Sequence, residues 1–248
     1  MVLLIKRYSL FVLLAALATS CDRQNAPDCF QRAGEWTVET REVGAHVTLI
    51  EVRDVIDLVL HDHDSFYLEV EGPYNLLNDI ETSVVDGKLT IRDHNTCNFV
   101  RKLGLRYKVH VYGEFRQLEH WGAGNVETDG VLERTSLYVE NHSASGSHYV
   151  RITCDTLSYK THTGTVDVTL EGTVHQLYMF NQGYDFMDAR GVLAEKAVAH
   201  SNSINRMDVR ATDYLQINIR SDGDVHYWEV PASLNVIGNG SGSAILED

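Results

Sequence analysis

The chain has 248 residues, of which 23% are charged and 44% are hydrophobic, a balance typical of a globular protein. It carries 35 Asp and Glu against 21 Lys and Arg, a formal net charge of −14 at pH 7. Such a surface repels phosphate backbones, so nucleic acid is not an expected partner. The 18 Gly against three Pro, together with many Thr, Val and Tyr, favour strands and tight turns and exclude a helical bundle.

Residues 1–20 have the pattern of a signal peptide. An apolar run follows the basic pair Lys6-Arg7 and is too short to cross a bilayer comfortably. The segment Leu17-Ala18-Thr19-Ser20-Cys21 resembles a bacterial lipobox, in which the cysteine thiol takes a diacylglycerol. An ordinary cleaved signal that happens to precede a cysteine is the alternative. We therefore expect lipidation at Cys21, a lipidated leash over residues 21–35, and a membrane as partner through that lipid anchor.

Three more cysteines follow, Cys29, Cys97 and Cys154. Export implies an oxidising compartment, in which disulfides persist. Cys29 and Cys97 both lie in irregular polar stretches, and we expect the disulfide between them. Cys154 lies in an alternating strand and is expected to be a lone thiol. The sequence contains neither a CxxC spacing nor a Cys/His zinc pattern.

A repeat of about twenty residues organises the second half of the chain. Strand-like openings recur every 18–20 residues, at Leu118, Leu137, Leu157, Leu177, Ala197, Leu215 and Leu234. One unit has too little apolar surface to fold alone, whereas stacked units bury a continuous core. We therefore predict an all-β fold in which residues 117–248 form a parallel β-helix, a solenoid of ~20-residue rungs. A propeller is the weaker alternative, because its blades need about 40 residues each.

Stacking of these units predicts ladders of equivalent side chains about 4.8 Å apart. One inward ladder should contain Leu137, Leu157 and Leu177, and another Val139, Tyr159 and Met179. A polar ladder at the turn should contain Asn141, Thr161, Asn181 and Ser201, whose side chains can bond along the axis.

Residues 36–116 also have strand patterns, but without a regular period. Ser83-Val84-Val85 and Lys88-Leu89-Thr90-Ile91 flank an Asp86-Gly87 pair, which is a good hairpin signal. We expect this part to continue the β-rich body or to cap its open end, where unpaired strand edges would otherwise be exposed.

Several of these segments resemble the auto-transporter adhesin head GIN domain family of bacterial envelope proteins. The segments are the hairpin over 85–91, the stretch 118–126 with Gly122-Ala123-Gly124, the turn Gly238-Asn239-Gly240-Ser241-Gly242, and residues 95–101. The resemblance covers residues 46–246 and implies a right-handed parallel β-helix. It also implies a lipid-anchored protein of a Gram-negative cell envelope, most naturally of the outer membrane. It brings no catalytic motif.

An acidic ledge is one candidate site. Asp167, Asp188 and Asp208 lie in the second strand of successive repeats, each flanked by apolar residues. Alternation would place them on the outer face, nearly in register, and with no Arg or Lys repeated nearby. Stacked carboxylates repel, so they could hold a cation or act in acid catalysis. A solvated acidic face is the alternative that we expect.

Histidines and tryptophans give further candidates. His61-Asp62-His63-Asp64 is the densest potential metal cluster, and His142 with His162 occupies matching positions in adjacent repeats; two His on one face can bind zinc or copper with a third ligand. We expect a polar turn at the first and no metal or cofactor at either. Trp36, Trp121 and Trp228 offer stacking surfaces for sugars, or they fill the core or seal an end of the solenoid.

We conclude from the sequence that the protein is a non-enzymatic envelope lipoprotein with an adhesin-type binding surface for a glycan or protein ligand. No catalytic residue is predicted. A polysaccharide-active enzyme that uses the acidic ledge is one alternative, and a structural module that stacks end to end is the other. Self-association would make the protein an oligomer.

Overall fold

The computed structural model describes residues 28–44, 46–95, 97, 99–102 and 104–247. The predicted signal peptide, Cys21 and residues 21–27 of the predicted leash lie outside the described residues. Within the described part, no helix is long and apolar enough to cross a membrane.

The described elements are almost all strands, so the predicted all-β class is confirmed. In chain order they are η2 (Asp28–Phe30), β1 (Trp36–Glu42), β2 (Leu49–Val52), β3 (Ile56–His61), β4 (Tyr67–Pro73), η3 (Tyr74–Asp79), β5 (Ile80–Val85), β6 (Lys88–Asp93), β7 (Tyr107–Tyr112), β8 (Gln117–His120), β9 (Val126–Asp129), β10 (Leu132–Asn181), β11 (Phe186–Ser201), β12 (Met207–Val209), β13 (Ala211–Ile219), β14 (Val225–Tyr227), β15 (Ser233–Gly238) and β16 (Ala244–Leu246).

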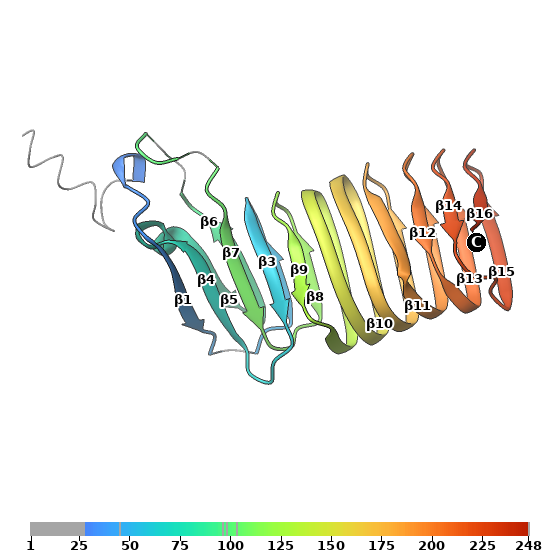
Figure 1. Ribbon diagram of the computed structural model, residues 1–248, viewed down its shortest axis with the longest axis horizontal. Helices are drawn as coiled ribbons and strands as arrows, with labels where there is room; N and C mark the ends of the chain where they lie inside the picture. The colour runs from blue at the N-terminus through green and yellow to red at the C-terminus, as the bar shows by residue number, and fades with distance from the viewer. Residues whose placement is uncertain (1–27, 45, 96, 98, 103, 248) are drawn as a thin grey trace, which may run out of the picture.

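The strands pair into one mixed, 16-stranded sheet that curls around the core. Figure 1 shows the strands following one another along the long axis of the molecule, from β1 at one end to β15 and β16 at the other. β10 and β11 are long because each continues through corners instead of ending at them. The sheet is continuous across residue 117, where the regular repeat begins.

The second half pairs in parallel at a nearly constant offset along the chain. Leu177 pairs with Ala197, which pairs with Leu215, which pairs with Leu234. A second line of parallel pairs joins Met187, Met207, Val225 and Ala244. The pairing therefore follows the repeat of about twenty residues that the sequence contains.

The two predicted apolar ladders are buried. Their members are at most 3% exposed: Leu137, Leu157, Leu177, Val139, Tyr159 and Met179. One unit opening was placed wrongly, whereas Leu234 pairs with Leu215 as the repeat predicts. Leu118 pairs with Val139, because the number of residues between paired positions is larger there than the repeat predicts. Leu118 therefore belongs to the second ladder. Leu234 is 42% exposed, because no further described strand covers β15.

The predicted polar ladder lies inside the turn. Its four members, Asn141, Thr161, Asn181 and Ser201, are fully buried. The Thr161 hydroxyl donates to Asn181 Oδ1 at 3.1 Å, a bond that runs along the axis between adjacent turns. Asn181 Nδ2 in turn donates to the Asp185 carbonyl at 2.8 Å, so this side chain also fixes the next corner.

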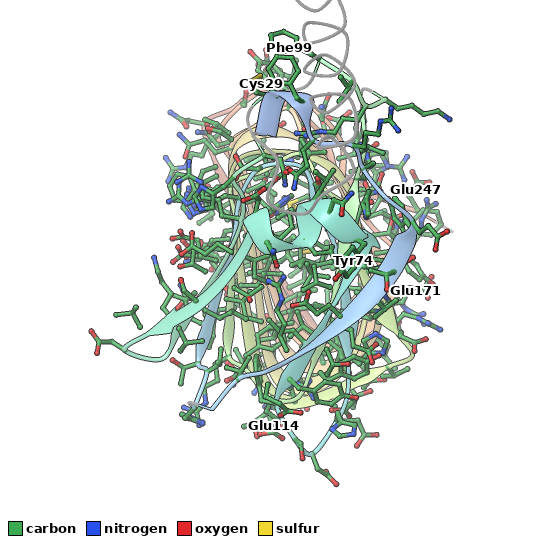
Figure 2. All side chains as sticks on the ribbon, turned by 90° about the vertical axis from the view of Figure 1, so that its left-hand side faces the viewer. Cys29, Tyr74, Phe99, Glu114, Glu171 and Glu247 are labelled. Carbon is green, nitrogen blue, oxygen red and sulfur yellow. A yellow bond between two sulfur atoms is a disulfide. The ribbon has the colours of Figure 1, made fainter. Side chains whose placement is uncertain are left out.

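The first half both continues the body and caps it. β2 pairs in parallel with β8, and β3 with β9, which adds a turn of the same kind. β5 and β6 form the predicted antiparallel hairpin, with positive φ at Asp86 and Gly87, as the favoured two-residue hairpin turn requires. β4 and β1 add antiparallel strands at the outer edge. Figure 2 shows η3 lying across this end, where Leu76 and Leu77 are buried.

Cys29 and Cys97 form a disulfide, with Cα atoms 4.5 Å apart. It ties η2 to the segment after β6, and Figure 2 shows Cys29 and Phe99 close together. Phe30 packs against Phe99, with ring centroids 5.8 Å apart. Cys154 is a free, buried thiol, and burial raises its pKa to about 11, so it has little thiolate character at neutral pH.

Candidate functional site

A stack of aromatic side chains runs along one outer face of the body. We call it the aromatic ladder and define it as Trp121, His142, His162, Phe180 and His200. Trp121 follows β8, and the other members belong to successive turns in β10 and β11. Equivalent outward positions in neighbouring strands lie about 4.8 Å apart, which is close to the stacking distance of rings. Five members therefore extend over about 19 Å.

The rings are in contact along the whole ladder. Trp121 and His142 stack at 4.2 Å between centroids, and His142 and His162 at 4.8 Å. Beyond His162 the rings are inclined, at 5.8 Å to Phe180 and then 5.2 Å to His200. The Arg53 guanidinium lies 5.1 Å from the Trp121 ring centroid and closes the other end of the stack as a cation–π contact.

One carboxylate serves the middle of the ladder. Glu140 Oε2 lies 3.5 Å from His142 Nε2 and 3.6 Å from His162 Nε2. Its other oxygen accepts a hydrogen bond from Lys160 Nζ at 2.8 Å. That bond, together with the neighbouring positive charges, lowers the pKa of Glu140, while burial opposes the shift. Burial, and then the neighbouring His162, lower the pKa of His142, which favours a neutral ring with a free nitrogen lone pair.

A buried polar chain begins at His120, the residue before Trp121. His148 contacts the Tyr159 hydroxyl through Nδ1, and its Nε2 lies 2.9 Å from His120 Nδ1. His120 and His148 are at most 1% exposed. Burial lowers the pKa of His120 to about 4 and that of His148 well below its usual range. Both rings are therefore neutral at physiological pH.

The His61-Asp62-His63-Asp64 segment ends β3 and enters a turn, as expected. The His61 ring stacks on Tyr112, with ring centroids 4.2 Å apart. Its Nδ1 lies 3.1 Å from Asp129 Oδ2, and its Nε2 lies 3.0 Å from His110 Nδ1. His63 instead accepts a hydrogen bond from the Ser65 amide at 3.0 Å. The two histidines thus have different partners and do not converge on one point.

The predicted acidic ledge is wrong in two respects. Asp167 pairs with Phe186, whereas Asp188 pairs with Thr169, so Asp167 falls out of register with the next aspartate. Only Asp188 and Asp208 pair directly. Arginines, which were not expected, hold both carboxylates: Arg190 lies 2.7 Å from Asp188 and Arg206 2.5 Å from Asp208.

Asp208 has a further partner, because Trp228 Nε1 donates to its Oδ1 at 2.7 Å. Although burial opposes the shift, the hydrogen bonds from Arg206 and Trp228 lower the pKa of Asp208. A carboxyl held ionised in this way cannot serve as a proton donor near neutral pH. The solvated acidic face is also wrong for Asp208, which is 5% exposed.

None of the three tryptophans fills the core. Trp36 is 52% exposed and donates to Glu71 at 2.8 Å. Trp228 is half-buried beside two guanidinium groups. Trp121 is 39% exposed, but both of its faces are covered, since β8 lies between β2, which leads to Arg53, and β10, which carries His142. Ligands can reach only its edge.

A second surface feature is a groove of about 750 Å³ along another corner of the turns. Its floor includes the buried Cys154, and its rim includes Glu133, Asp155, His175 and Glu195. The His175 ring and Glu195 pair at 2.6 Å. The acidic rim makes this groove unsuitable for anionic ligands.

Sequence reasoning paired His142 with His162 but missed three of their neighbours. Glu140 could have been found, because it shares a strand face with His142 two positions away. Phe180 and His200 lie one outward position earlier in their turns, so a strict position-by-position comparison of repeats does not align them with the two histidines. His120 and His148 carried no signal that separates a buried histidine from an exposed one.

The fold and this surface define a class: an elongated all-β protein of repeated turns, with an exposed ladder of aromatic and polar side chains. The chain belongs to the family described as "Putative auto-transporter adhesin, head GIN domain", whose family model matches residues 47–231. A comparison with curated proteins finds no match.

Solved structures share this fold at low sequence identity. A protein described as a putative adhesin from Bacteroides fragilis has a TM-score of 0.78 at 19% identity, over 87% of this chain and 99% of that one. One described as a putative lipid binding protein from Parabacteroides distasonis has a TM-score of 0.64 at 23% identity, over 88% and 100%. A putative adhesin from Parabacteroides merdae has a TM-score of 0.60 at 15% identity, over 86% and 97%.

Proposed function

We propose that the protein is a non-enzymatic binding module of the bacterial cell envelope, and that the aromatic ladder is its ligand-binding surface. The observation that carries the proposal is the ladder itself: stacked rings with polar edges, repeated over successive turns of a rigid sheet. A family described as an adhesin head and neighbours described as adhesins or a lipid binding protein support a binding role.

The arrangement of the acids supports binding over catalysis. Cleavage of a glycosidic bond needs a proton donor with a raised pKa beside a second carboxylate. Asp188 and Asp208 are each held by an arginine, and the pKa of Asp208 is lowered. We therefore do not retain the acidic ledge as a catalytic site.

The geometry of the ladder limits the kind of ligand it suits. Because the faces of Trp121 are covered, a sugar ring cannot stack on them. The ring edges instead present apolar rims and the imidazole atoms that do not face Glu140, at intervals of about 4.8 Å. Such a surface suits an extended, uncharged polymer that lies along the axis and hydrogen-bonds repeatedly, and a neutral glycan chain is the ligand we propose.

The test is a glycan array probed with the protein and two variants. Wild type should retain neutral glycans, and Trp121→Ala should weaken that retention at least about tenfold, because it removes the ring that orders the stack. Trp36→Ala is the matched control, since Trp36 is exposed but lies outside the ladder. Equal retention by Trp121→Ala and wild type would contradict the ladder as the binding surface, and so would retention of no glycan by wild type.

We further propose that the coil of parallel turns is a right-handed β-helix and that the mature chain is anchored to the outer membrane through acylated Cys21. The nearly constant number of residues between strands that pair in parallel supports the β-helix. The lipobox-like residues 17–21 support the lipid anchor. Cys21→Ser should abolish lipid labelling and release the protein from membranes.

End-to-end self-association is a second candidate function, and β15 is the observation that favours it. Its six residues are all exposed and uncharged, and in the described part of the chain it pairs with β13 alone. Leu234, Val236 and Ile237 are each more than 40% exposed there. An uncharged strand with one unpaired edge and apolar side chains is a template for pairing with another strand.

A further inference from the structure

Three potential metal ligands converge in the middle of the aromatic ladder. Glu140, His142 and His162 each offer one ligand atom, and these atoms lie within 4.8 Å of one another. Both histidine Nε2 atoms face the same carboxylate oxygen, at 3.5 and 3.6 Å. In a tetrahedral zinc site with bonds of about 2.0–2.1 Å, neighbouring ligand atoms are about 3.3–3.4 Å apart. Each carboxylate–imidazole distance therefore has to shorten by only a few tenths of an ångström, and the two imidazole nitrogens, which lie within 4.8 Å of each other, have to approach to the same separation.

One of these atoms lacks a hydrogen-bond partner. His162 Nε2 is inaccessible to solvent and makes no hydrogen bond within the described part of the chain. Buried polar atoms are nearly always satisfied, so an orphan atom calls for an explanation. A bound cation between this nitrogen and the Glu140 carboxylate would supply the missing partner.

The surroundings hold the ligands in place. Trp121 stacks on the His142 ring and Phe180 packs against the His162 ring. Asn141 and Thr161, which precede the two histidines, are fully buried, and the Thr161 hydroxyl donates to Asn181 Oδ1 at 3.1 Å. Lys160 binds the other oxygen of Glu140 at 2.8 Å, which leaves Oε2 free to face the imidazoles. A site whose ligands are already ordered loses little conformational entropy on binding.

The chemistry of the ligands selects the metal. Two imidazole nitrogens and one carboxylate oxygen match Zn²⁺ and Cu²⁺ and are a poor match for Mg²⁺ or Ca²⁺, which prefer oxygen ligands. The negative net charge of the protein raises the local concentration of cations. The ammonium of Lys160 opposes binding, because it lies on the same carboxylate.

We propose that Glu140, His142 and His162 form a surface site for a divalent transition metal, with zinc or copper held by two Nε2 atoms and one carboxylate oxygen. The fourth coordination position is then open to water or to an atom of a bound ligand, as in metal sites with three protein ligands. The proposal does not depend on glycan binding, because the three side chains are in place without any ligand.

The experiment is a calorimetric titration of the untagged, metal-free protein with ZnCl₂, in the absence of glycan. Wild type should bind one equivalent of zinc with micromolar affinity. His142→Ala, His162→Ala and Glu140→Gln should each weaken binding at least about tenfold, the loss seen even for partners outside the ligand set. Lys160→Met should tighten binding about two- to fivefold, the effect of one exposed charge pair.

The control is His175→Ala, which removes a histidine that also pairs with a glutamate but belongs to no group of three potential ligands among the described residues; zinc affinity should not change. Electron paramagnetic resonance of the protein with one equivalent of Cu²⁺ should show two nitrogen ligands, and one in His162→Ala. Because these side chains are on the surface, thermal melts of the metal-free variants should match wild type. Absence of zinc binding in wild type, or unchanged affinity in both histidine variants of the site, would overturn the proposal.

Discussion

At the scale of single residues, the most informative feature is the pair of buried histidines, His120 and His148, joined through ring nitrogens 2.9 Å apart. Burial penalises the charged imidazolium, so both remain neutral in the folded protein. The sequence could not reveal this, because a histidine at an inward position looks the same in sequence as one at a solvated turn.

These two histidines predict a loss of stability in acid. In the unfolded chain an imidazole has a pKa of about 6.5, whereas in the fold the pKa of His120 is about 4 and that of His148 is lowered well below its usual range. Between those values the unfolded chain binds protons that the folded chain does not, so the free energy of unfolding decreases as the pH falls from about 6.5 to about 4. The loss from His120 alone is about 3 kcal/mol at the acid end.

Denaturant unfolding of wild type and His120→Gln at pH 7 and pH 4.5 checks this prediction. The variant should lose less stability between the two pH values, whatever its absolute stability, because it has one fewer buried imidazole. His175→Gln, which changes an exposed histidine, should keep the wild-type difference. An unchanged pH dependence in His120→Gln would contradict the assignment.

The aromatic ladder shows which neighbouring side chains could be predicted from the sequence. The match between His142 and His162 followed from the repeat, because equivalent positions of successive repeats fall on neighbouring turns. The acidic ledge failed because Asp167 lies opposite Phe186, while Asp188 lies opposite Thr169. A small change in the length of one corner, invisible in composition, decides which side chains face each other.

At the scale of elements, the turn Gly122-Ala123-Gly124 allows two segments of backbone to approach closely. A Cβ built on Gly124 would lie 1.7 Å from the Ile56 carbonyl oxygen, at the start of β3. Moving a side chain could not make room for a methyl group there, because the atoms that it would meet belong to the backbone. This glycine is therefore required for β3 to pair with β9.

Gly124→Ala should lower the free energy of unfolding by about 3 kcal/mol or more, because the backbone must shift to admit the methyl group. Gly44→Ala is the matched control: a Cβ there meets no atom of the described part of the chain within 4 Å, so its effect should be below about 0.5 kcal/mol. Chemical denaturation measures both. Similar stability of the two variants would show that β3 and the turn do not approach as described.

Strand positions could be predicted from the sequence wherever the repeat was regular or a turn had a clear signal. The Asp86-Gly87 hairpin and the inward ladders of the second half were predicted from turn chemistry and spacing alone. The first half was not resolved in the same way, because β2 and β3 pair with β8 and β9, which lie far away along the chain. Nothing local in the chain records such a long-range pairing.

At the scale of the whole molecule, the two ends of the body differ. η3 and the antiparallel strands β4 and β1 cover the core at one end (Figure 2). At the other end β15 and β16 are the last described strands (Figure 1). The molecule therefore has one closed end and one end that offers an edge for pairing.

If copies associate through β15, sedimentation velocity should show the mass rising with protein concentration. Val236→Lys should keep the protein monomeric, because a charge on an edge strand opposes pairing, and Val236 is already 49% exposed, so the fold should be retained. Val85→Lys alters another exposed valine, in the first half, and should behave as wild type. A wild type that is monomeric at every concentration would count against self-association at this edge.

The binding function that we propose requires that the molecule holds a ligand without changing it. The most direct measurement incubates the protein with the glycan that it retains best and determines the chain length of that glycan by mass spectrometry before and after. We predict that the glycan is recovered intact, with and without added calcium or zinc, while Trp121→Ala fails to retain it. Recovery of shortened or unsaturated chains from wild type, and of intact chains from a folded Asp188→Asn variant, would contradict a non-enzymatic role and favour a polysaccharide-active enzyme.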